Sequence, residues 1–407
     1  MHRTLTIVGF AGWAFACAGR SGPESSQNPV RPGLQVLLED SLHLVLGRRV
    51  GLVTNQGGVD AAGVHAVERL RGAGVNLVAL FSPEHGFRGT AAPGEVVSSA
   101  RDSASGLPIY SLYGRTSSPT DSMLRDIDVM LVDLPDVGAR YYTYLSTTVE
   151  VMKAAGRRGI PVIILDRPNP IGGAVQGNVL DTAYRSFVGL LAMPMRHGMT
   201  LGELARLAQS DLAIRVTLAI VPVSGWERNR YLDQTGLPFI RPSPNLSTLE
   251  SLFHYPGLCL VEGTNLSVGR GSDAPFEQVG APWLDTTKVL DDLRRLALPG
   301  VQFSATHFTP SQPGDGKYAD TLLAGIRLRV TNRDTYDPTR AAVELLSAIF
   351  REQPDRARFT PAQFDRLAGD SLLRTQITEG VAVQTIVGSW VQSREQFEKR
   401  RREFLIY

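Results

Sequence analysis

Cysteine is scarce in this chain, with two thiols among 407 residues. Cys17 falls in an N-terminal leader, which leaves Cys259 alone in the apolar run 257–261. A single thiol excludes a disulfide framework and a cysteine-based metal site. Cys259 is therefore expected to be a small core residue.

The chain also lacks a strong charge of either sign. Its 42 basic and 40 acidic residues give a formal net charge of +2, and no Lys/Arg block is long enough to form a basic arm. This balance argues against nucleic acid as a partner. The short basic cluster 399–402 is predicted to be the solvated face of a C-terminal helix.

Familiar catalytic and nucleotide-binding motifs are missing as well. No strand leads into G-x-G-x-x-G, and the chain has no G-x-x-x-x-G-K-[ST], H-E-x-x-H or G-x-S-x-G. Its seven histidines are scattered without metal-ligand spacing. We therefore predict no cofactor and no metal. His197, just before a predicted helix, either reaches the functional site or serves as a structural histidine.

The N-terminus is predicted to be an export signal followed by a tether. The apolar run Leu5–Phe15 is too short to span a bilayer, and Ala14-Phe15-Ala16, just before Cys17, fits the small-residue cleavage pattern of a secretory signal. This pattern is similar to a bacterial lipoprotein signal, in which the cysteine is lipidated. We expect a signal peptide over 1–17 with lipidation at Cys17, a flexible linker over 18–34, and export to the periplasm or cell envelope.

From about residue 35, strand-like and helix-like segments alternate. Apolar runs without hairpin signals, separated by helical patterns, indicate parallel βαβ units. We predict an α/β fold, with a Rossmann-like, doubly wound, mostly parallel sheet over 35–247 and a smaller α/β (α+β) domain over 248–407. The Pro-rich run 237–245 marks the boundary. The expected strands of the first domain are Arg49–Thr54, Val75–Phe81, Pro108–Tyr113, Val129–Leu134, Pro161–Leu165 and Val216–Val221.

Helical patterns lie between these strands and in the second domain. In the first domain we expect helices over Val64–Ala73 and Tyr144–Arg157, and a capping box at Thr200 opens a third. In the second, Leu323–Val330 alternates like a strand. Segments Pro338–Phe350 and Ser389–Phe404 are predicted to be helices.

The most informative segment follows the second strand. Glu84, His85 and Arg88 stand within five residues in a loop that also holds Gly86 and Gly89. In open α/β sheets, ligands bind outside the carboxyl ends of the strands, so an acid there is a good candidate for proton transfer. An ordinary turn with Glu84 paired to Arg88 would explain the same residues.

Other strands also end in polar or aromatic side chains. If the sheet is parallel, these residues gather at one edge and form a single crowded site. Amides, carboxylates, arginines and aromatic rings together suit a sugar, although each residue alone could serve a cap or a turn. The residues concerned, besides the Glu84 loop, are Asn55, Gln56, Asp133, Asp136, Arg140, Tyr142, Asp166 and Asn169.

A glycine-rich loop of the second domain offers a facing wall. Glu262, Asn265 and Arg270 lie in the segment 261–271, which follows an apolar run. Such a loop can approach a ligand closely, and Arg270 can reach a carboxylate. An ordinary glycine-rich connection explains the segment equally well.

Several of these segments together resemble the exo-acting β-N-acetylmuramidases, a family of peptidoglycan glycoside hydrolases. The resemblance runs from about residue 35 to the C-terminus and implies a Rossmann-like domain, a smaller C-terminal domain and a site between them. Members remove N-acetylmuramic acid from the non-reducing end of peptidoglycan fragments. The matching segments are Gly51–Gln56, Ser82–Gly86, Asp133–Tyr144, Asp166–Pro170, Glu262–Asn265 and Gly269–Gly271.

The resemblance implies site residues by position. Glu84 is expected to be the general acid, while Asp133, Glu95 or Glu262 is the second catalytic group, unless the substrate's own acetamido oxygen attacks. Of these, Asp133 is named with Glu84 as the predicted catalytic pair. The lactyl carboxylate requires a cation, for which Arg88, Arg140 and Arg270 are candidates. The residues expected to bind the sugar are Asn55, Gln56, His85, Arg88, Arg140, Tyr142, Asn169, Glu262, Asn265 and Arg270.

The expected partners are muropeptides or disaccharides derived from peptidoglycan, with the membrane reached only through the lipid anchor. Two other functions fit the same residues. One is a sugar-binding lipoprotein that keeps the cleft without catalysis. The other is an esterase or amidase acting on cell-wall fragments, against which the missing nucleophile elbow argues.

Overall fold

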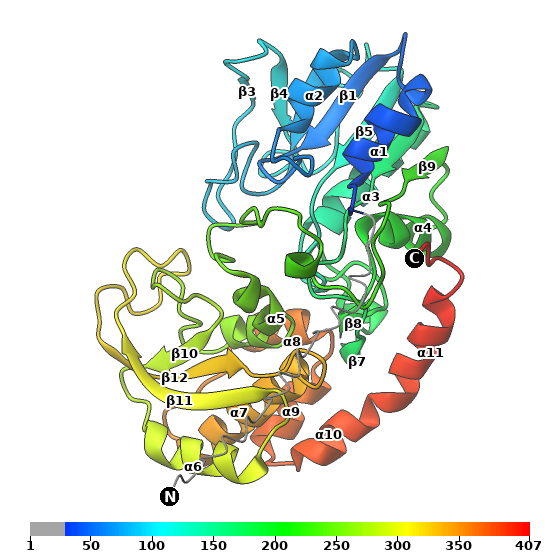
Figure 1. Ribbon diagram of the computed structural model, residues 1–407. Helices are drawn as coiled ribbons and strands as arrows, with labels where there is room; N and C mark the ends of the chain where they lie inside the picture. Colours follow the sequence, from blue (N-terminus) through cyan, green and yellow to red (C-terminus); the bar gives the residue numbers. More distant parts are fainter. Residues whose placement is uncertain (1–28) are drawn as a thin grey trace, which may run out of the picture.

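The computed structural model describes residues 29–407, which form two domains (Figure 1). The N-terminal domain is built on a seven-stranded sheet with the order β3-β4-β2-β1-β5-β6-β9. All neighbouring strands pair in parallel except β3, which is antiparallel to β4. The predicted α/β fold with a mostly parallel, doubly wound sheet is confirmed. Its strands are β1 Arg49–Thr54, β2 Asn76–Ser82, β3 Ala100–Arg101, β4 Pro108–Ser111, β5 Val129–Asp133, β6 Val162–Leu165 and β9 Leu218–Val221.

Side chains point alternately to the two faces of this sheet, and both faces carry apolar residues that helices cover. On one face, Leu52 and Leu131 pack with α1 (Gly33–Asp40) and α2 (Ala66–Gly72). On the other, Val53 and Val132 belong to the core that includes α3 (Tyr144–Arg157) and α4 (Leu201–Asp211). β5 is buried along its whole length, as its nearly continuous apolar run requires.

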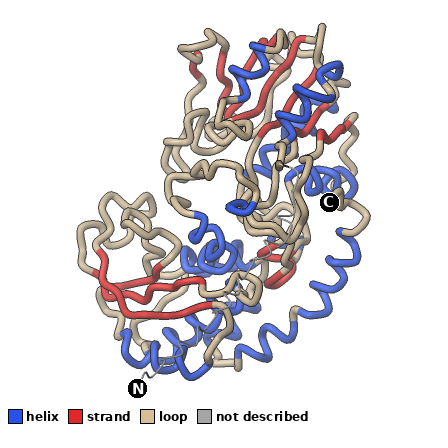
Figure 2. Tube along the Cα trace, in the orientation of Figure 1, coloured by secondary structure: helices blue, strands red, loops and turns tan. Residues whose placement is uncertain are grey.

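The C-terminal domain packs helices on a three-stranded antiparallel sheet with the order β10-β12-β11. Figure 2 shows this smaller sheet apart from the larger one. In this domain the sequence predicted β12, α7 and one terminal helix over Ser389–Phe404. Its elements are α5 Leu249–Leu258, β10 Gln278–Ala281, α6 Thr286–Leu296, β11 Val301–Phe308, β12 Leu323–Val330, α7 Pro338–Glu352, α8 Pro361–Ala368, α9 Leu372–Thr378 and α10 Val383–Ser389.

Two elements tie the domains together. A hairpin of β7 (Gln176–Val179) and β8 (Pro194–Arg196) leaves the first domain and contacts α7. Helix α11 (Val391–Arg401) then runs back along the molecule toward α4 (Figure 1). The single helix predicted over Ser389–Phe404 is thus divided, since α10 ends at Ser389 and α11 begins at Val391.

Two residues of the basic cluster dock onto the N-terminal domain, which corrects part of the expectation of a solvated face. Arg400 pairs with Asp211 at 2.7 Å. Arg401 is half-buried and donates to the carbonyls of Gly173 and Gly198. Lys399 and Arg402 are exposed, as predicted.

The predicted leader, with Cys17, lies outside the described residues. The linker predicted to reach residue 34 ends earlier, because Val30 is buried and α1 begins at Gly33. Gly33 packs so closely on Asp166 that a Cβ there would approach its backbone nitrogen to 2.4 Å. Within residues 29–407, no helix combines the length and apolarity needed to cross a bilayer.

Candidate functional site

Glu84 lies in the loop after β2 and is 9% exposed. The chain turns sharply there, with positive φ angles at His85 (69°) and Gly86 (75°). One Glu84 oxygen, Oε2, accepts a hydrogen bond from Thr143 Oγ1 at 2.8 Å. The other, Oε1, accepts from the backbone N–H of Gly94 at 3.1 Å. The carboxyl group is therefore fixed from two sides of the loop.

His85 is held beside Glu84 as a neutral ring. Its Nδ1 lies 2.8 Å from the carbonyl oxygen of Ala91. Burial lowers the His85 pKa, and the nearby Arg270 guanidinium adds to this, against the opposing effects of Glu84 and the Ala91 hydrogen bond. An imidazole in this state can donate and accept hydrogen bonds at neutral pH.

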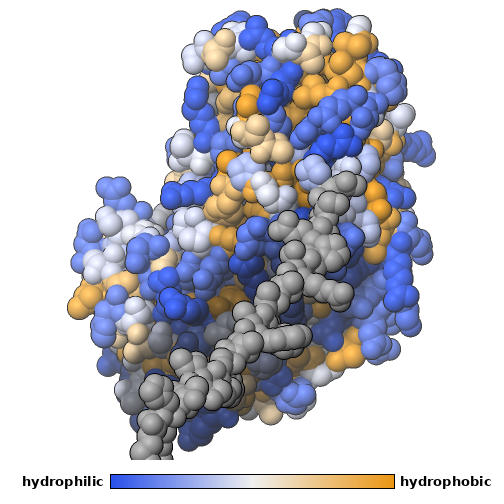
Figure 3. Space-filling model, in the orientation of Figure 1, coloured by the Kyte–Doolittle hydropathy of each residue, from blue (hydrophilic) through white to orange (hydrophobic). Residues whose placement is uncertain are grey.

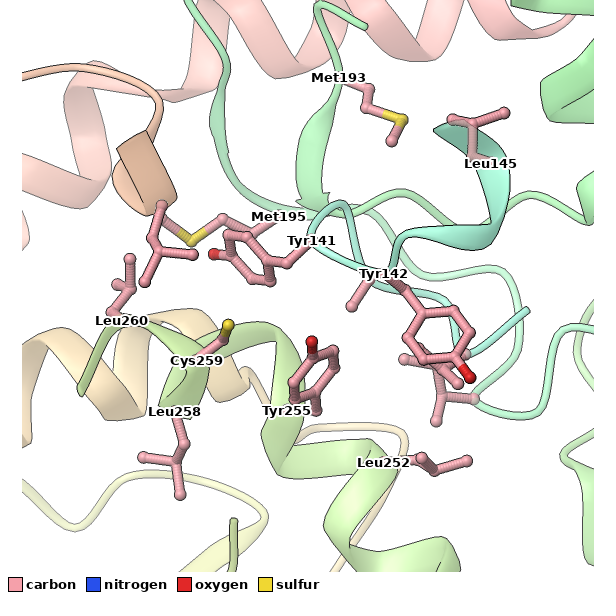
Figure 4. Packing of buried hydrophobic residues seen from close by; sticks show 14 of the residues in the cluster. Tyr141, Tyr142, Leu145, Met193, Met195, Leu252, Tyr255, Leu258, Cys259 and Leu260 are labelled. Atoms are coloured by element: carbon pink, nitrogen blue, oxygen red, sulfur yellow. The ribbon is translucent and has the colours of Figure 1, made fainter. Parts of the chain in front are cut away.

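Glu84 and His85 line a cavity of about 630 Å³ between the two domains, here called the interdomain cavity. Figure 4 shows the boundary between the domains, where Tyr141 and Tyr142 of the first domain lie across from Tyr255 and Cys259 of the second. In Figure 3 the outline of the molecule is indented where the domains meet. The residues lining the cavity are Glu84, His85, Pro93, Tyr141, Tyr142, Thr143, Val188, Ser243, Leu246, Tyr255, Cys259, Glu262, Arg270, Phe276 and Leu367.

The C-terminal domain supplies a charged wall to this cavity. Arg270 Nε lies 2.5 Å from Glu262 Oε1, and the guanidinium sits 5.0 Å from the centre of the Phe276 ring. Its Nη1 is buried and has no hydrogen-bond partner among the described residues. A buried guanidinium with a free N–H is ready to bind an anionic group.

Comparison with known proteins bears directly on this arrangement. Family models described as the N-terminal and C-terminal parts of exo-β-N-acetylmuramidase NamZ match residues 50–250 and 253–407. The chain belongs to the NamZ family. It is 41% identical, over the full length of both chains, to the peptidoglycan β-N-acetylmuramidase NamZ of Bacillus subtilis (strain 168).

Solved structures agree with this assignment. Two DUF1343 family proteins from Bacteroides fragilis NCTC 9343 are similar to this chain, each over 93% of it and 99% of their own chains. The first is 34% identical with a TM-score of 0.86, and the second is 30% identical with a TM-score of 0.75. The fold is thus shared with these DUF1343 family proteins.

In this NamZ-family chain, the strand-end residues do not form one crowded site. Asp133 is fully buried and forms a bidentate ion pair with Arg167 at 2.6 and 3.0 Å. Asn55 donates to Tyr144 Oη at 2.7 Å, and Asn169 donates to the carbonyl of Met199 at 2.9 Å. These three residues lie outside the lining of the interdomain cavity, where their side chains hold loops together.

The predicted arginines separate in the same way. Arg88 is 70% exposed and lies 3.9 Å from Asp102, on another groove. Arg140 is buried, and its Nη1 and Nη2 donate to four backbone carbonyls, including those of Asn178 and Leu367. Only Arg270 of the three candidates lines the interdomain cavity.

The remaining predicted residues occupy mixed positions. Tyr142 lines the interdomain cavity with its hydroxyl bonded to the Pro242 carbonyl at 2.8 Å. Gln56 donates to the Arg241 carbonyl, also at 2.8 Å. Asn265 is half-buried and lies outside the lining of the interdomain cavity, and its side chain donates to the Arg356 carbonyl and accepts from the Arg358 N–H. His197 is buried beside Asp136 at 3.5 Å, so the structural alternative describes it.

Thr143, which holds Glu84 through its hydroxyl, was not predicted as a site residue. It belongs to the Asp133–Tyr144 segment, and a threonine just before a predicted helix reads as a helix cap. Cys259 was expected in the core and does lie buried, yet its thiol also faces the interdomain cavity near Glu262 Oε2 at 3.6 Å. Burial raises the Cys259 pKa well above its usual range, so the thiol is neutral.

A second cavity, of about 560 Å³, opens at the carboxyl ends of β1, β5 and β6 and is here called the strand-end cavity. Residues 237–242 of the Pro-rich segment form much of its wall. Its charged residues already have partners within the chain, since Asp60 pairs with Arg69 and Arg167 with Asp133. Among the described residues, no group of three or more His, Cys, Asp or Glu side chains could hold a metal ion.

Proposed function

We propose that this chain is an exo-acting β-N-acetylmuramidase that releases N-acetylmuramic acid from the non-reducing end of peptidoglycan fragments. The observation that carries the proposal is a cavity with a buried acid, Glu84, on one wall and a guanidinium with a free N–H, Arg270, on the other. Membership of the NamZ family and the 41% identical muramidase of Bacillus subtilis support it.

Glu84 is the proposed general acid. It gives its proton to the glycosidic oxygen as the bond from that oxygen to the anomeric carbon breaks, and water then adds to the anomeric carbon. Thr143 and Gly94 fix the carboxyl group, which keeps it oriented toward the leaving oxygen. Such prior positioning lowers the barrier without movement during the reaction.

Three groups are candidates for the second catalytic group, which acts with the general acid. Glu262 lines the interdomain cavity, although its Oε1 is tied to Arg270. Glu95 directly follows the glycine whose amide holds Glu84, and it is exposed. The substrate's acetamido oxygen is the third. Asp133 is engaged by Arg167 outside the cavity, so it is not retained in the proposal.

Arg270 is the proposed partner of the lactyl carboxylate. A free guanidinium N–H can accept a second carboxylate while Nε stays bound to Glu262. The neutral His85 ring and the Tyr142 ring complete the contacts with the sugar.

The decisive experiment compares the wild-type protein with Glu84→Gln. Wild-type protein should release the aglycone from a chromogenic β-N-acetylmuraminide and free N-acetylmuramic acid from a disaccharide fragment. Glu84→Gln should lower kcat by at least about 10³-fold while the ligand still binds, because the shape is kept and the proton is lost. Full turnover by the variant would show that Glu84 is not the acid.

The same experiment separates the alternatives. A sugar-binding lipoprotein would bind the fragment in both forms and cleave it in neither. An esterase or amidase would yield products whose masses differ from N-acetylmuramic acid. Either result in folded protein would overturn the proposal.

Export and anchoring through Cys17 are also proposed, from the pattern of residues 1–17. A peptidoglycan substrate lies outside the cytoplasm, which agrees with an exported enzyme. Metabolic labelling with a fatty acid tests the anchor. Label on wild-type protein that is lost in Cys17→Ala is expected, and equal labelling of both would contradict it.

A further inference from the structure

Two half-buried aromatic rings lie near Glu84. Tyr113 follows β4, whose pairing with β2 sets Leu112 against Ser82 and so brings Tyr113 next to Glu84. Its ring centre is 6.2 Å from that of Phe187, with 55° between the planes. Burial and the adjacent Glu84 raise the pKa of Tyr113 to about 12, so the phenol is neutral.

Phe187 stands at the tip of a tight turn. Ser186 and Gly189 close this turn through two backbone hydrogen bonds of 2.9 and 3.2 Å. Ser146 of α3 donates to the Phe187 carbonyl at 2.7 Å and fixes the tip to the first domain. The next residue, Val188, lines the interdomain cavity. The tip therefore holds two apolar side chains at the cavity's edge.

The apolar edge continues on the other side of Tyr113. Val97 donates its backbone N–H to the Tyr113 carbonyl at 3.3 Å. Its neighbour Val96 is 58% exposed and lies against Gly114, where a Cβ would meet Val96 Cγ1 at 2.6 Å. Val96 and Tyr113 thus add accessible apolar surface near Val188, which lines the interdomain cavity, and neighbouring exposed apolar side chains indicate a binding surface.

The position of Glu84 decides what this surface faces. A general acid must lie next to the oxygen that leaves, so apolar groups beside Glu84 are placed to contact the departing sugar. The C–H faces of a pyranose ring are apolar and match half-buried aromatic rings. The charged wall with Arg270 would hold the muramic acid ring.

We propose that Tyr113, Phe187 and Val188 form the subsite for the leaving sugar, an N-acetylhexosamine ring that stacks beside Glu84. This inference rests on the proposed muramidase function. It assigns the aglycone to the N-terminal domain and the lactyl group to the C-terminal domain.

The test compares two substrates that differ only in the leaving group. One is the disaccharide of N-acetylmuramic acid and N-acetylglucosamine, and the other is a methyl β-N-acetylmuraminide. In Phe187→Ala, kcat/KM for the disaccharide should fall about tenfold, while kcat/KM for the methyl glycoside should change less than about twofold, because only the first has a ring to stack.

Matched variants separate stacking from other effects. Phe239→Ala removes an equally half-buried ring from the strand-end cavity and should change neither substrate. Tyr113→Phe keeps the ring and loses the hydroxyl beside Glu84, so it should lower kcat for both substrates and leave KM for the disaccharide nearly unchanged. If Phe187→Ala fails to fold, Val188→Ser gives the same comparison.

The outcomes are distinct. Equal losses on both substrates, or no loss on either, in folded Phe187→Ala would overturn the subsite while leaving the muramidase function standing. If wild-type protein cleaves neither substrate, the proposed function fails and the subsite fails with it.

Discussion

The two cavities at the carboxyl edge of the large sheet differ in how their polar groups are used. The strand-end cavity lies beside the point between β1 and β5 where the strand order reverses, the usual ligand position in doubly wound folds. Its charged groups are paired, and the Pro-rich segment 237–242 lies against it. The interdomain cavity contains a free guanidinium N–H and an acid within reach.

This difference supports the interdomain cavity, and not the position favoured by the fold, as the proposed place of the chemistry. Gln56 and Tyr142 bond the carbonyls of Arg241 and Pro242, which holds the Pro-rich segment over the strand ends. A polar ligand needs an unpaired partner, and the free N–H of Arg270 is found in the interdomain cavity, where β2 ends near the second domain. Fold analogy alone would direct attention to the strand-end cavity instead.

The largest expected effect on stability comes from the ion pair beside the strand-end cavity. Asp133→Asn leaves Arg167 without its carboxylate in a buried place and should lower the free energy of unfolding by about 3 kcal/mol. The folded protein should keep most of its activity. Chemical unfolding and an activity assay on the same sample check this.

A matched control is Asp128→Asn. Asp128 also binds an arginine, Arg49, but both side chains are exposed, so little stability should be lost. If Asp133→Asn is as stable as this control, or abolishes activity while folded, the contrast between the two cavities is wrong.

A smaller effect is expected for the charged wall of the interdomain cavity. Arg270→Ala removes a charge-assisted hydrogen bond to the lactyl group and should lower kcat/KM for the disaccharide by about 10²-fold. Arg270→Lys keeps the charge but not the planar fork, so it should recover only part of the loss. Steady-state kinetics measure both variants. Unchanged kcat/KM in Arg270→Ala would remove the lactyl assignment.

The smallest effect concerns pH. Burial raises the pKa of Asp166 to about 6, against the hydrogen bonds from Thr200, Gly202 and Tyr407. The native protein then binds more protons than the unfolded chain between about pH 4 and 6, so stability falls as pH rises through this window. Ionisation of Asp166 should therefore lower the free energy of unfolding by about 1 to 2 kcal/mol between pH 5 and pH 8.

Asp166→Asn removes this titration. Thermal unfolding at pH 5 and pH 8 should show a steeper loss of stability in wild-type protein than in the variant. His85 provides an internal check, because its lowered pKa favours the native state at higher pH and acts in both proteins. Identical pH dependence in the two proteins would refute the prediction for Asp166.

Sequence patterns predicted the first domain well and the second poorly. β1, α3 and the strand at Leu323–Val330 agree with their predicted bounds, because long apolar runs and clear helical spacing determine them. β10 and β11 carry no such signal, since a sheet with one exposed face and many polar residues resembles loop. The docking of Arg400 and Arg401 was not predicted, because charge alone does not show whether an arginine side chain contacts solvent or other groups of the protein.

The candidate site was predicted in part. Glu84 and Arg270 stand in one cavity, as the resemblance implied. Asp133, Asn169 and Arg140 also follow strand ends or belong to matching segments, yet they hold the structure together. Sequence cannot separate the two uses, because a buried polar side chain needs partners whether or not it touches a substrate.

The contact between Asp166 and Tyr407 has a consequence for biosynthesis. Tyr407 donates to the Asp166 carboxylate at 2.8 Å and packs against Trp226. A residue translated 241 positions after Asp166 thus completes the packing of the first domain. A nascent chain that has completed only its N-terminal half carries this carboxylate without one of its three donors. The first domain therefore reaches its final packing only after the second has been translated and α11 has returned to it.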